Sequence, residues 1–318
     1  MRGAIDFTPG RNTQSGGWLG DFRYENGRIL VKSTGVWMKN DFQLWSDIFR
    51  WLTYYAFVRL HGVWAALSRP RGARIFFTPH RPRPWYIVWA ALVWGGMRFA
   101  RSAAEADASF YFEDQTQAVP PAPPTRRAFN FAVGDVSKTY VARAMEAAFG
   151  YPLAVDPATF VGEAVEKGEG NGLHDGRVVT CPVEPAPGKA YQRIIKTEGE
   201  DGWAYDLRTA CVARKPIVVF LKKKPAEARF SIQNTSVVVK RPEEVFSPAD
   251  IAQIEHFCDT MQLDWAGLDV LREQETGRLY IVDVNKTDTG PAVVLNWRDR
   301  ATATRLLSEA LGAMLTSS

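Results

Sequence analysis

Apolar and polar residues alternate over two short stretches near the C-terminal end of the chain, at 268–271 and 279–285. A polar segment that contains Gly277 separates them. Alternation with a period of two is typical of half-buried strands, and the glycine between the stretches indicates a β-hairpin. Because side chains two residues apart leave the same face of a strand, Asp283 and Asn285 are predicted to point the same way.

Asp269 lies on the other predicted strand of this hairpin and can oppose Asp283 and Asn285. Two carboxylates and an amide oxygen flanked by apolar residues are costly to bury without a cation. Oxygen ligands of this kind suit Mg²⁺, which takes one or two carboxylates together with water and phosphate oxygens. The alternative is that the three side chains lie on the solvated face of an edge hairpin.

The remaining pattern predicts a mixed order of helices and strands. A strand, a helix and a strand between 74 and 113 suggest a small α/β unit, and the proline-rich stretch 118–124 reads as a stiff linker. We therefore divide the chain into an aromatic-rich segment 1–70, a small α/β domain with its linker 71–125, and a larger domain 126–318. The predicted helices are 41–67, 85–100, 136–149, 247–262 and 298–315; the predicted strands include 20–24, 28–31, 74–77, 109–113, 129–133, 153–155, 191–195, 206–213 and 217–222.

Composition narrows the class of protein only a little. A net charge of +4 over 318 residues permits an anionic substrate but does not argue for nucleic acid. Three widely spaced cysteines without a CxxC pair suggest reduced thiols in a cytoplasmic protein and no zinc site. The longest uncharged apolar run, 85–97, is shorter than the ~20 residues of a membrane span.

The N-terminal part of the chain is rich in tryptophan. Eight of the eleven tryptophans fall in the first 94 residues, several of them on the predicted helix 41–67. An aromatic helix of this kind can lie on a membrane surface or pack against the following domain or a second subunit. We favour packing, because charged residues interrupt the stretch without a cluster of lysines, and a homodimer is then plausible.

A glycine-rich loop interrupts the middle of the chain between two apolar strands. Four glycines fall within the nine residues 168–176, and Lys167 stands just before them. Glycine lets backbone N–H groups approach phosphates closely, and a lysine adds a point charge. The loop is not a Walker sequence. The alternative is that the loop is a simple flexible turn. The lysine run 222–224 also has two interpretations: a positive face that binds phosphate, or a solvated strand end.

The order of these features resembles the ATP-grasp superfamily over roughly 129–291. The resemblance implies an ATP-grasp fold of two α+β subdomains, an α/β class protein preceded by a small α/β domain. The resemblance rests on short motifs spread along the chain. Each motif by itself is loose, but the order in which the motifs occur is moderately specific. They are Lys138, Lys167, Tyr191 to Ile195, Asp206 to Arg208, Lys222, Arg229, Asn234, Gly267 to Asp269, and Asp283 to Asn285.

The resemblance also implies a role for each matching residue. It assigns the nucleotide phosphates to Lys138 and Lys167 with the loop glycines Gly170 and Gly172. The hinge beside the adenine falls on Gln192, Arg193, Ile194 and Ile195, catalysis on Arg208 and Lys222, and Mg²⁺ on Asp269, Asp283 and Asn285. Many members have Glu where this chain has Asp283, and the run 286–291 is more charged than expected, which suggests a contact with substrate.

The implied activity is that of an ATP- and Mg²⁺-dependent ligase. It would join a carboxylate to an amine, on small molecules or peptides, through an acyl phosphate, and release ADP and phosphate. One alternative is a sugar or polyol kinase on the same scaffold, with Asp175, Asp206 or His174 as base. Another is a nucleotide-binding protein without turnover. The carbon–nitrogen ligase is the prediction that follows from the resemblance. The complete acid, acid and Asn set argues against a protein without turnover, whereas nothing in the sequence excludes the kinase.

Overall fold

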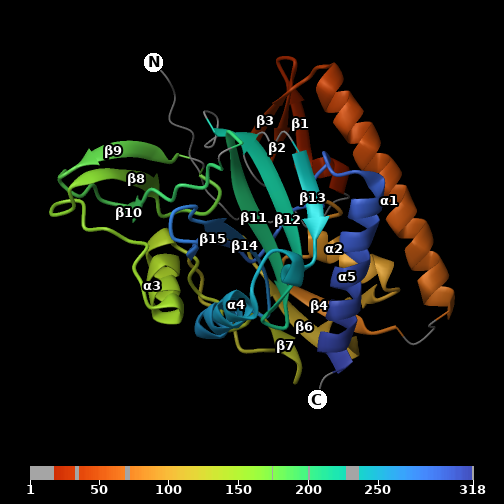
Figure 1. Ribbon diagram of the computed structural model, residues 1–318. Helices are drawn as coiled ribbons and strands as arrows, with labels where there is room; N and C mark the ends of the chain where they lie inside the picture. Colours follow the sequence, from red (N-terminus) through yellow and green to blue (C-terminus); the bar gives the residue numbers. More distant parts are fainter. Residues whose placement is uncertain are drawn as a thin grey trace.

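The computed structural model describes residues 18–32, 36–68, 72–173, 175–199, 201–226 and 236–316. Within these residues the strands form four sheets, and helices cover the two larger ones (Figure 1). The fold is mixed α/β, as the sequence predicts. The smallest lobe, β8–β9–β10, lies to one side of the large central sheet, and the long helix α1 lies on the other side (Figure 1).

The N-terminal part forms a three-stranded antiparallel sheet and one long helix. The sheet contains β1 (Phe22–Glu25), β2 (Arg28–Val31) and β3 (Val36–Lys39), after the 3-10 turn η1 (Trp18–Asp21). The predicted strands 20–24 and 28–31 form the hairpin β1–β2, and Asn26 and Gly27 have the positive φ of its turn. The predicted helix 41–67 is α1 (Phe42–Ser68), which buries Tyr54 and Val58 against α2.

A parallel sheet follows, in the order β5-β4-β6-β7. It contains β4 (Arg74–Pro79), β5 (Arg98–Phe99), β6 (Ala108–Phe112) and β7 (Ala128–Phe129), with α2 (Ile87–Trp94) and the 3-10 turn η2 (Ala103–Glu105) between strands. Two predictions are wrong here. The helix 85–100 ends at Trp94, because Gly96 takes a φ of +70° and the chain turns into β5.

The predicted strand 129–133 also ends early, at Phe129. Asn130 has a φ of +60°, and its side chain bonds to the backbone of Asp264 and Trp265 instead of continuing the strand. These bonds tie the end of the parallel sheet to the start of β14 in the central sheet. β7 thus belongs to the parallel sheet, beside β6.

The small lobe is an antiparallel sheet with one helix. Its order is β10-β8-β9, from β8 (Gly162–Gly168), β9 (Arg177–Cys181) and β10 (Lys189–Arg193). The helix α3 (Lys138–Phe149) begins at the cap Ser137 and ends at Gly150 with a φ of +79°. The predicted strand 153–155 does not form; within it only Ala154 makes an isolated bridge, to Gln192.

The central sheet has five antiparallel strands in the order β13-β12-β11-β14-β15. β12 runs to Pro225, so the lysine run lies inside the strand and not beyond its end. α4 and α5 confirm the last two predicted helices. The bounds are β11 (Trp203–Val212), β12 (Lys215–Pro225), β13 (Ser236–Lys240), η4 (Pro242–Glu244), α4 (Pro248–Met261), β14 (Trp265–Arg272), β15 (Leu279–Asn285) and α5 (Trp297–Thr316).

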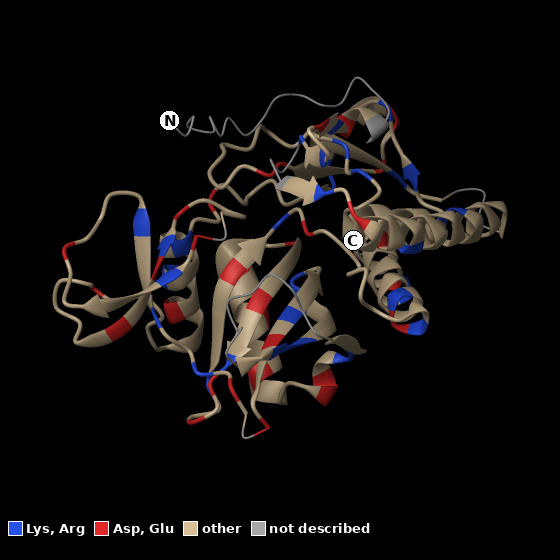
Figure 2. Cartoon of the chain, turned by 90° about the horizontal axis from the view of Figure 1, so that it is seen from above, with Lys and Arg blue, Asp and Glu red and all other residues tan. Residues whose placement is uncertain are grey.

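Each face of the central sheet has its own core. One face packs against α3 and α4, with Leu268, Val270 and Val284 fully buried. The other face packs at one end against α5 and the parallel sheet, through residues such as Phe220 and Trp265. The opposite end of this second face carries charged residues, visible as alternating acidic and basic bands on neighbouring strands (Figure 2). No helix within the described residues is long and apolar enough to cross a membrane.

Candidate functional site

The charged end of the central sheet brings the three predicted metal ligands onto one face. Asp269 of β14 lies directly opposite Asp283 of β15, and Gly267 lies opposite Asn285. Residues opposite each other in an antiparallel pair project from the same face, so both carboxylates and the amide point into one region. Their side chains are partly exposed, Asp269 by 31% and Asp283 by 21%.

A β-bulge at Val282 makes this arrangement compatible with a buried core. The register shifts between Asp269 and Val270, so that Val270 pairs with Ile281 and Val282 has no partner across the ladder. An extra residue in one strand reverses the alternation beyond it. Ile281 therefore enters the core on one face while Asp283 reaches the opposite face.

Arg208 of β11 is the central cation of the site. Its Nη1 donates to Asp269 Oδ1 at 2.8 Å, and its Nη2 donates to Asp288 Oδ1 at 2.6 Å. In the amide orientation that satisfies its neighbours, Asn285 accepts from both nitrogens at 2.7 and 3.0 Å. Burial alone raises the pKa of Asp269, but the charges of Arg208 and then Lys222 outweigh it and lower the pKa to about 2.

Two lysines reach the same region from the small lobe. Lys138, the first residue of α3 and almost fully buried, forms an ion pair with Asp283. Lys167 of β8 donates to the carbonyl of the bulge residue, Val282 O, at 3.0 Å. Burial lowers the pKa of Lys167 to about 8, and the charge of Asp283 only partly offsets this. The structure thus places both predicted phosphate-binding lysines beside the carboxylates.

The glycine-rich loop folds back onto the start of α3. Glu169 accepts from the Thr139 backbone N–H at 3.0 Å and from its hydroxyl, and the Asn171 N–H donates to Thr116 Oγ1 at 2.7 Å. A helix N-terminus favours negative charge, so Glu169 holds a position that suits an anion. A Cβ at Gly170 would lie 2.8 Å from Leu173 Cδ1, whereas Gly172 has a φ of +72°.

The predicted hinge residues lie in and just after β10. Ile195 is part of the core beside α3, and Ile194 is half-buried. Gln192 is buried opposite Val165 and Arg193 is half-buried opposite Ala164. Gln192 Nε2 and Arg193 Nε are buried without a hydrogen-bond partner within the described chain.

Lys222, the second predicted catalytic residue, lies on the same face as the carboxylates. Asp206 is its partner across β11 and β12, and Asp206 and Arg208 are two apart on β11. The charge of Lys222 contributes to the low pKa of Asp269. Asp206 instead pairs with Lys224 at 2.9 Å, and Asp175 pairs with Lys189 at 2.6 Å. His174, Arg229 and Asn234 lie outside the described residues.

The segment after β15 adds residues that we did not assign from the sequence. Asp288 is buried and pairs with Arg208, and its carbonyl accepts from the N–H of Ile87 at the start of α2 at 3.0 Å. Thr287 donates to Asp114, which follows β6. Lys286 is 1% exposed and its Nζ has no hydrogen-bond partner within the described chain. The unusual charge of this run was the signal for these contacts.

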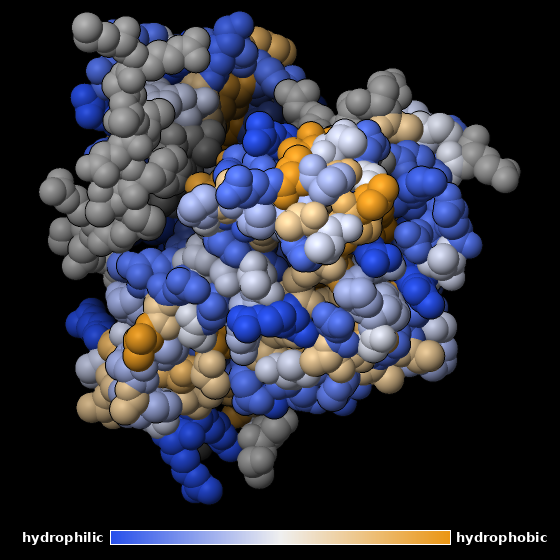
Figure 3. Space-filling model, turned by 90° about the vertical axis from the view of Figure 1, so that its left-hand side faces the viewer, coloured by the Kyte–Doolittle hydropathy of each residue, from blue (hydrophilic) through white to orange (hydrophobic). Residues whose placement is uncertain are grey.

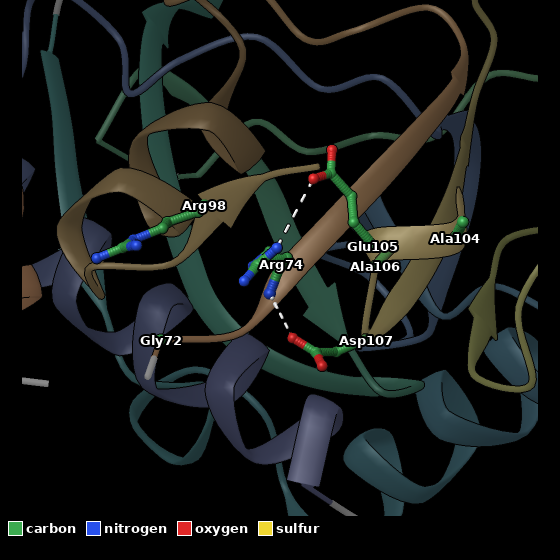
Figure 4. A pocket seen from close by; sticks show the side chains of 7 residues that line it. All are labelled: Gly72, Arg74, Arg98, Ala104, Glu105, Ala106 and Asp107. Atoms are coloured by element: carbon green, nitrogen blue, oxygen red, sulfur yellow. Dashed lines mark hydrogen bonds and ion pairs between the residues drawn. The ribbon is translucent and has the colours of Figure 1, made fainter. Parts of the chain in front are cut away.

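Two other observations test whether the site lies elsewhere. Among the described residues, no group of three or more His, Cys, Asp and Glu side chains is arranged to hold a metal ion. A shallow pocket between Arg74, Arg98 and Asp107 lies at the amino ends of the parallel strands (Figure 4). Ligands of parallel sheets bind at the carboxyl ends, which here lead to Asp114 and Thr116, so this pocket is a poor candidate.

Comparisons with known proteins agree with this geometry at the level of the fold. The ATP-grasp ligase PsnB, solved with a phosphomimetic variant of its minimal precursor, Mg and ADP, gives a TM-score of 0.51 at 12% identity, covering 77% of this chain and 99% of that chain. The chain has the ATP-grasp fold. PsnB with its minimal precursor gives 0.50 at 12% identity, covering 76% and 99%. No protein-family model matches the chain, and no curated protein matches it.

Gly267 is a sensitive position because Asp288 and Arg208 pack closely against its backbone. A Cβ there would collide with Asp288 Oδ2 and lie 2.9 Å from Arg208 Nε. We expect Gly267→Ala to lower the free energy of unfolding by about 1–3 kcal/mol, because it forces the buried ion pair apart. Gly312→Ala is the control: nothing lies within 4 Å of its Cβ, and in the helix α5 it should stabilise by about 1 kcal/mol. Chemical denaturation measures both, and equal effects would contradict the prediction.

Proposed function

We propose that the protein is an ATP- and Mg²⁺-dependent ligase that joins a carboxylate to an amine. The observation that carries this proposal is the convergence of Asp269, Asp283 and Asn285 with Arg208, Lys138 and Lys167 on one end of the central sheet. The PsnB structure with Mg and ADP, a ligase of the same fold, supports it. Both the bond formed and the substrates belong to the proposal.

The carboxylates fit a divalent cation. Two Asp oxygens and one amide oxygen are hard ligands, and each already contacts a positive group, Arg208 or Lys138. These cations balance the charge of the carboxylates in the structure described here. Asp269, Asp283 and Asn285 would hold Mg²⁺, which when bound would neutralise charge on phosphate oxygens.

The lysines and the start of α3 fit the phosphates. Lys138 and Lys167 come from the small lobe and point at the carboxylate side of the site. Glu169, which now bonds to Thr139 at the helix N-terminus, would give up these bonds to an anion of higher charge. Gln192 Nε2 and Arg193 Nε are buried donors without partners, and we assign them to the nucleotide base beside the hinge.

Arg208 would bind charge on the transferred phosphoryl group, with Lys222 on the same face adding positive potential. A carboxylate oxygen of the substrate would attack the γ-phosphorus, and ADP would leave with the electrons of the broken P–O bond. The amine nitrogen would then attack the acyl carbon and expel phosphate. Neither step requires a nucleophile from the protein, so positioning and charge are what the site must supply.

The kinase alternative has less support. A kinase needs a base near the acceptor hydroxyl. Of the three candidates, Asp206 pairs with Lys224, Asp175 pairs with Lys189, and His174 lies outside the described residues, so the described chain places none of them as an unpaired base. The segment 286–288 connects Arg208 to the small α/β domain, and we propose that the acceptor substrate, a small molecule or peptide, binds beside it. We also propose the division into three domains given above and a homodimer. The three free cysteines suggest a cytoplasmic location.

Phosphate release from ATP tests the ligase directly. We would incubate the purified chain with Mg·ATP, pools of amino acids and short peptides as carboxylates, and hydroxylamine as the amine. A ligase of this type forms hydroxamate and free phosphate in equal amounts, since hydroxylamine traps an acyl phosphate. Phosphate retained on an organic product would identify a kinase, and absence of nucleotide binding by calorimetry would overturn the proposal.

The pKa of Lys167 predicts how nucleotide affinity depends on pH. Only the protonated lysine attracts phosphate, and without ligand its pKa is about 8. Affinity for Mg·ATP should be constant below pH 7 and fall as pH rises through 8, by at most about tenfold per pH unit for one proton. Near pH 8 binding should take up protons, which calorimetry in buffers of different ionisation enthalpy measures.

Lys167→Gln is the matched variant for this titration. It should bind Mg·ATP more weakly at pH 7 and lose both the pH dependence above 7 and the proton uptake. A variant that kept the wild-type pH dependence would assign the titration to another group.

A further inference from the structure

The helix α1 carries an apolar stripe that no part of the described chain covers. We define the stripe as the outward residues of α1 that recur along its whole length. At the ends, Phe42 is 88% exposed and Leu67 is 78% exposed. A contiguous exposed patch of this extent is unusual on a monomer and marks an interaction surface. Its members are Phe42, Trp45, Phe49, Leu52, Ala56, Leu60, Val63, Trp64 and Leu67.

The stripe is distinct from the face by which α1 packs against the rest of the chain. That face buries Tyr54, Val58 and Ala65 against α2, where Trp89 and Trp94 complete the cluster. On a helix of 3.6 residues per turn the two faces point in nearly opposite directions. The fold of this chain therefore accounts for only one of the two apolar faces of α1.

The spacing of the stripe suits another helix. With Trp64 set aside, consecutive members are three or four residues apart from Phe42 to Leu67. This is the pattern of a helix–helix seam, in which each side chain inserts between residues of a facing helix. The charged residues of α1 are Asp47, Arg50 and Arg59, and the last two flank the stripe on either side. The long helix α1 is accordingly mostly uncharged in Figure 2.

The area of the stripe is that of a stable protein interface. At roughly 200 Å² for a large aromatic side chain, the exposed fractions of its four aromatic residues amount to roughly 550 Å². The exposed leucines and valine bring the total near the ~800 Å² that each partner buries in a standard interface. By contrast, the side of the molecule that carries β8–β9–β10 is mostly hydrophilic, with small scattered apolar areas (Figure 3).

We propose that the occupant of this stripe is the same stripe of a second copy of the chain, so that α1 pairs with α1 in a symmetric dimer. A stripe that repeats every three or four residues is complementary to a copy of itself, and a two-fold axis lets one patch serve both subunits. A lipid surface fits less well, because recognition of anionic lipid takes a cluster of lysines and arginines, and α1 has two arginines beside one aspartate. This proposal is independent of the proposed ligase activity.

The molecular mass in solution tests the dimer. Light scattering on the full chain over a range of concentrations should give twice the chain mass of 35.6 kDa. Phe49→Glu with Leu60→Glu places charges on the stripe at exposed positions and should return the mass to that of one chain. Val161→Glu, an equally drastic change at an 83% exposed valine before β8, should leave the dimer intact.

Three results would overturn the proposal. They are a wild-type chain that stays monomeric at every concentration, a dimer that survives both stripe substitutions, or a monomer that floats with phosphatidylcholine–phosphatidylserine vesicles through the stripe. Cross-linking is a second test, which does not depend on whether the glutamate variant folds.

Ala56→Cys lies near the middle of the stripe, where the two copies meet in either a parallel or an antiparallel pair of helices. A short bismaleimide should link it into dimers, whereas Val161→Cys should give none, since the native cysteines are buried. Equal linking at both positions would count against the proposal.

Discussion

Asp283→Asn should lower the proposed ligase turnover by about a thousandfold and remove most of the Mg²⁺ dependence of nucleotide binding. The carboxylate of Asp283 is directly opposite Asp269 and is the one that Lys138 approaches. An amide of the same shape keeps the packing but withdraws one negative charge from the cation. Stabilisation of transferred charge by a bound metal contributes several kcal/mol, and each ~1.4 kcal/mol is a factor of ten in rate.

Calorimetry and turnover together check this prediction. We would titrate Mg·ATP and metal-free ATP into the wild type and the variant, then measure phosphate release at saturating nucleotide. The control is Asp259→Asn on α4, an isosteric change at a surface carboxylate that pairs with Arg214 and lies outside the site. Metal-dependent binding that is equal in Asp283→Asn and wild type would place the cation elsewhere. A double variant that also removes Asn285 should bind no more Mg²⁺ than the single one.

Arg208→Met should lower both activity and stability. In phosphoryl transfer an arginine that neutralises the moving group contributes about 10³–10⁵ in rate, so we expect a loss of at least a thousandfold. The same substitution leaves the buried carboxylate of Asp288, which is 7% exposed, without its partner. Removing one member of a buried pair costs about 3–5 kcal/mol, and the free energy of unfolding should fall by about that amount.

A second substitution separates the two effects. Arg208→Met with Asp288→Asn removes the stranded charge and should recover a large part of the stability while activity stays lost. Arg305→Met is the control for removing an arginine, because its ion pair with Glu309 is exposed and contributes only a few tenths of a kcal/mol. A stable Arg208→Met protein would mean that Asp288 has another partner.

The effect of Arg208→Met on the free energy of unfolding should depend on pH. The pKa of Asp269 is lowered from 3.8 to about 2, so its interaction with the cations stabilises the folded state above pH 4 and is lost as pH falls to 2. The gap in unfolding free energy between wild type and Arg208→Met should therefore be complete above pH 4 and shrink below it.

Part of the sheet and helix pattern was readable from local sequence because the relevant forces are local. The hairpin at β14 and β15, the cap and stop of α3 at Ser137 and Gly150, and the turn at Asn26 all depend on residues within a few positions. Period-two alternation also placed Asp283 and Asn285 together. Three predictions failed. The helix to 100 ends where Gly96 has a positive φ, the strand to 133 ends where Asn130 makes long-range bonds, and the strand 153–155 is reduced to one isolated bridge.

The bulge at Val282 could not be read from the sequence. Strict alternation puts Ile281 on the same face as Asp283, yet Ile281 is fully buried in the core and Asp283 faces the site. The extra residue is set by how β15 meets β14 and α3, which are packing constraints from distant parts of the chain. Lys167 donates to the carbonyl of this bulge residue.

The sequence by itself determined which residue types line the site and in what order they occur, because the chemistry of an acid, an amide or a lysine follows from the identity of the single residue. It also determined that α1 is a long helix rich in aromatic residues. Only the tertiary structure decided that Asp288 holds Arg208 and that Glu169 bonds to the start of α3. It also decided which face of α1 is left uncovered. Those facts depend on contacts between segments tens of residues apart, which alternation and spacing do not encode.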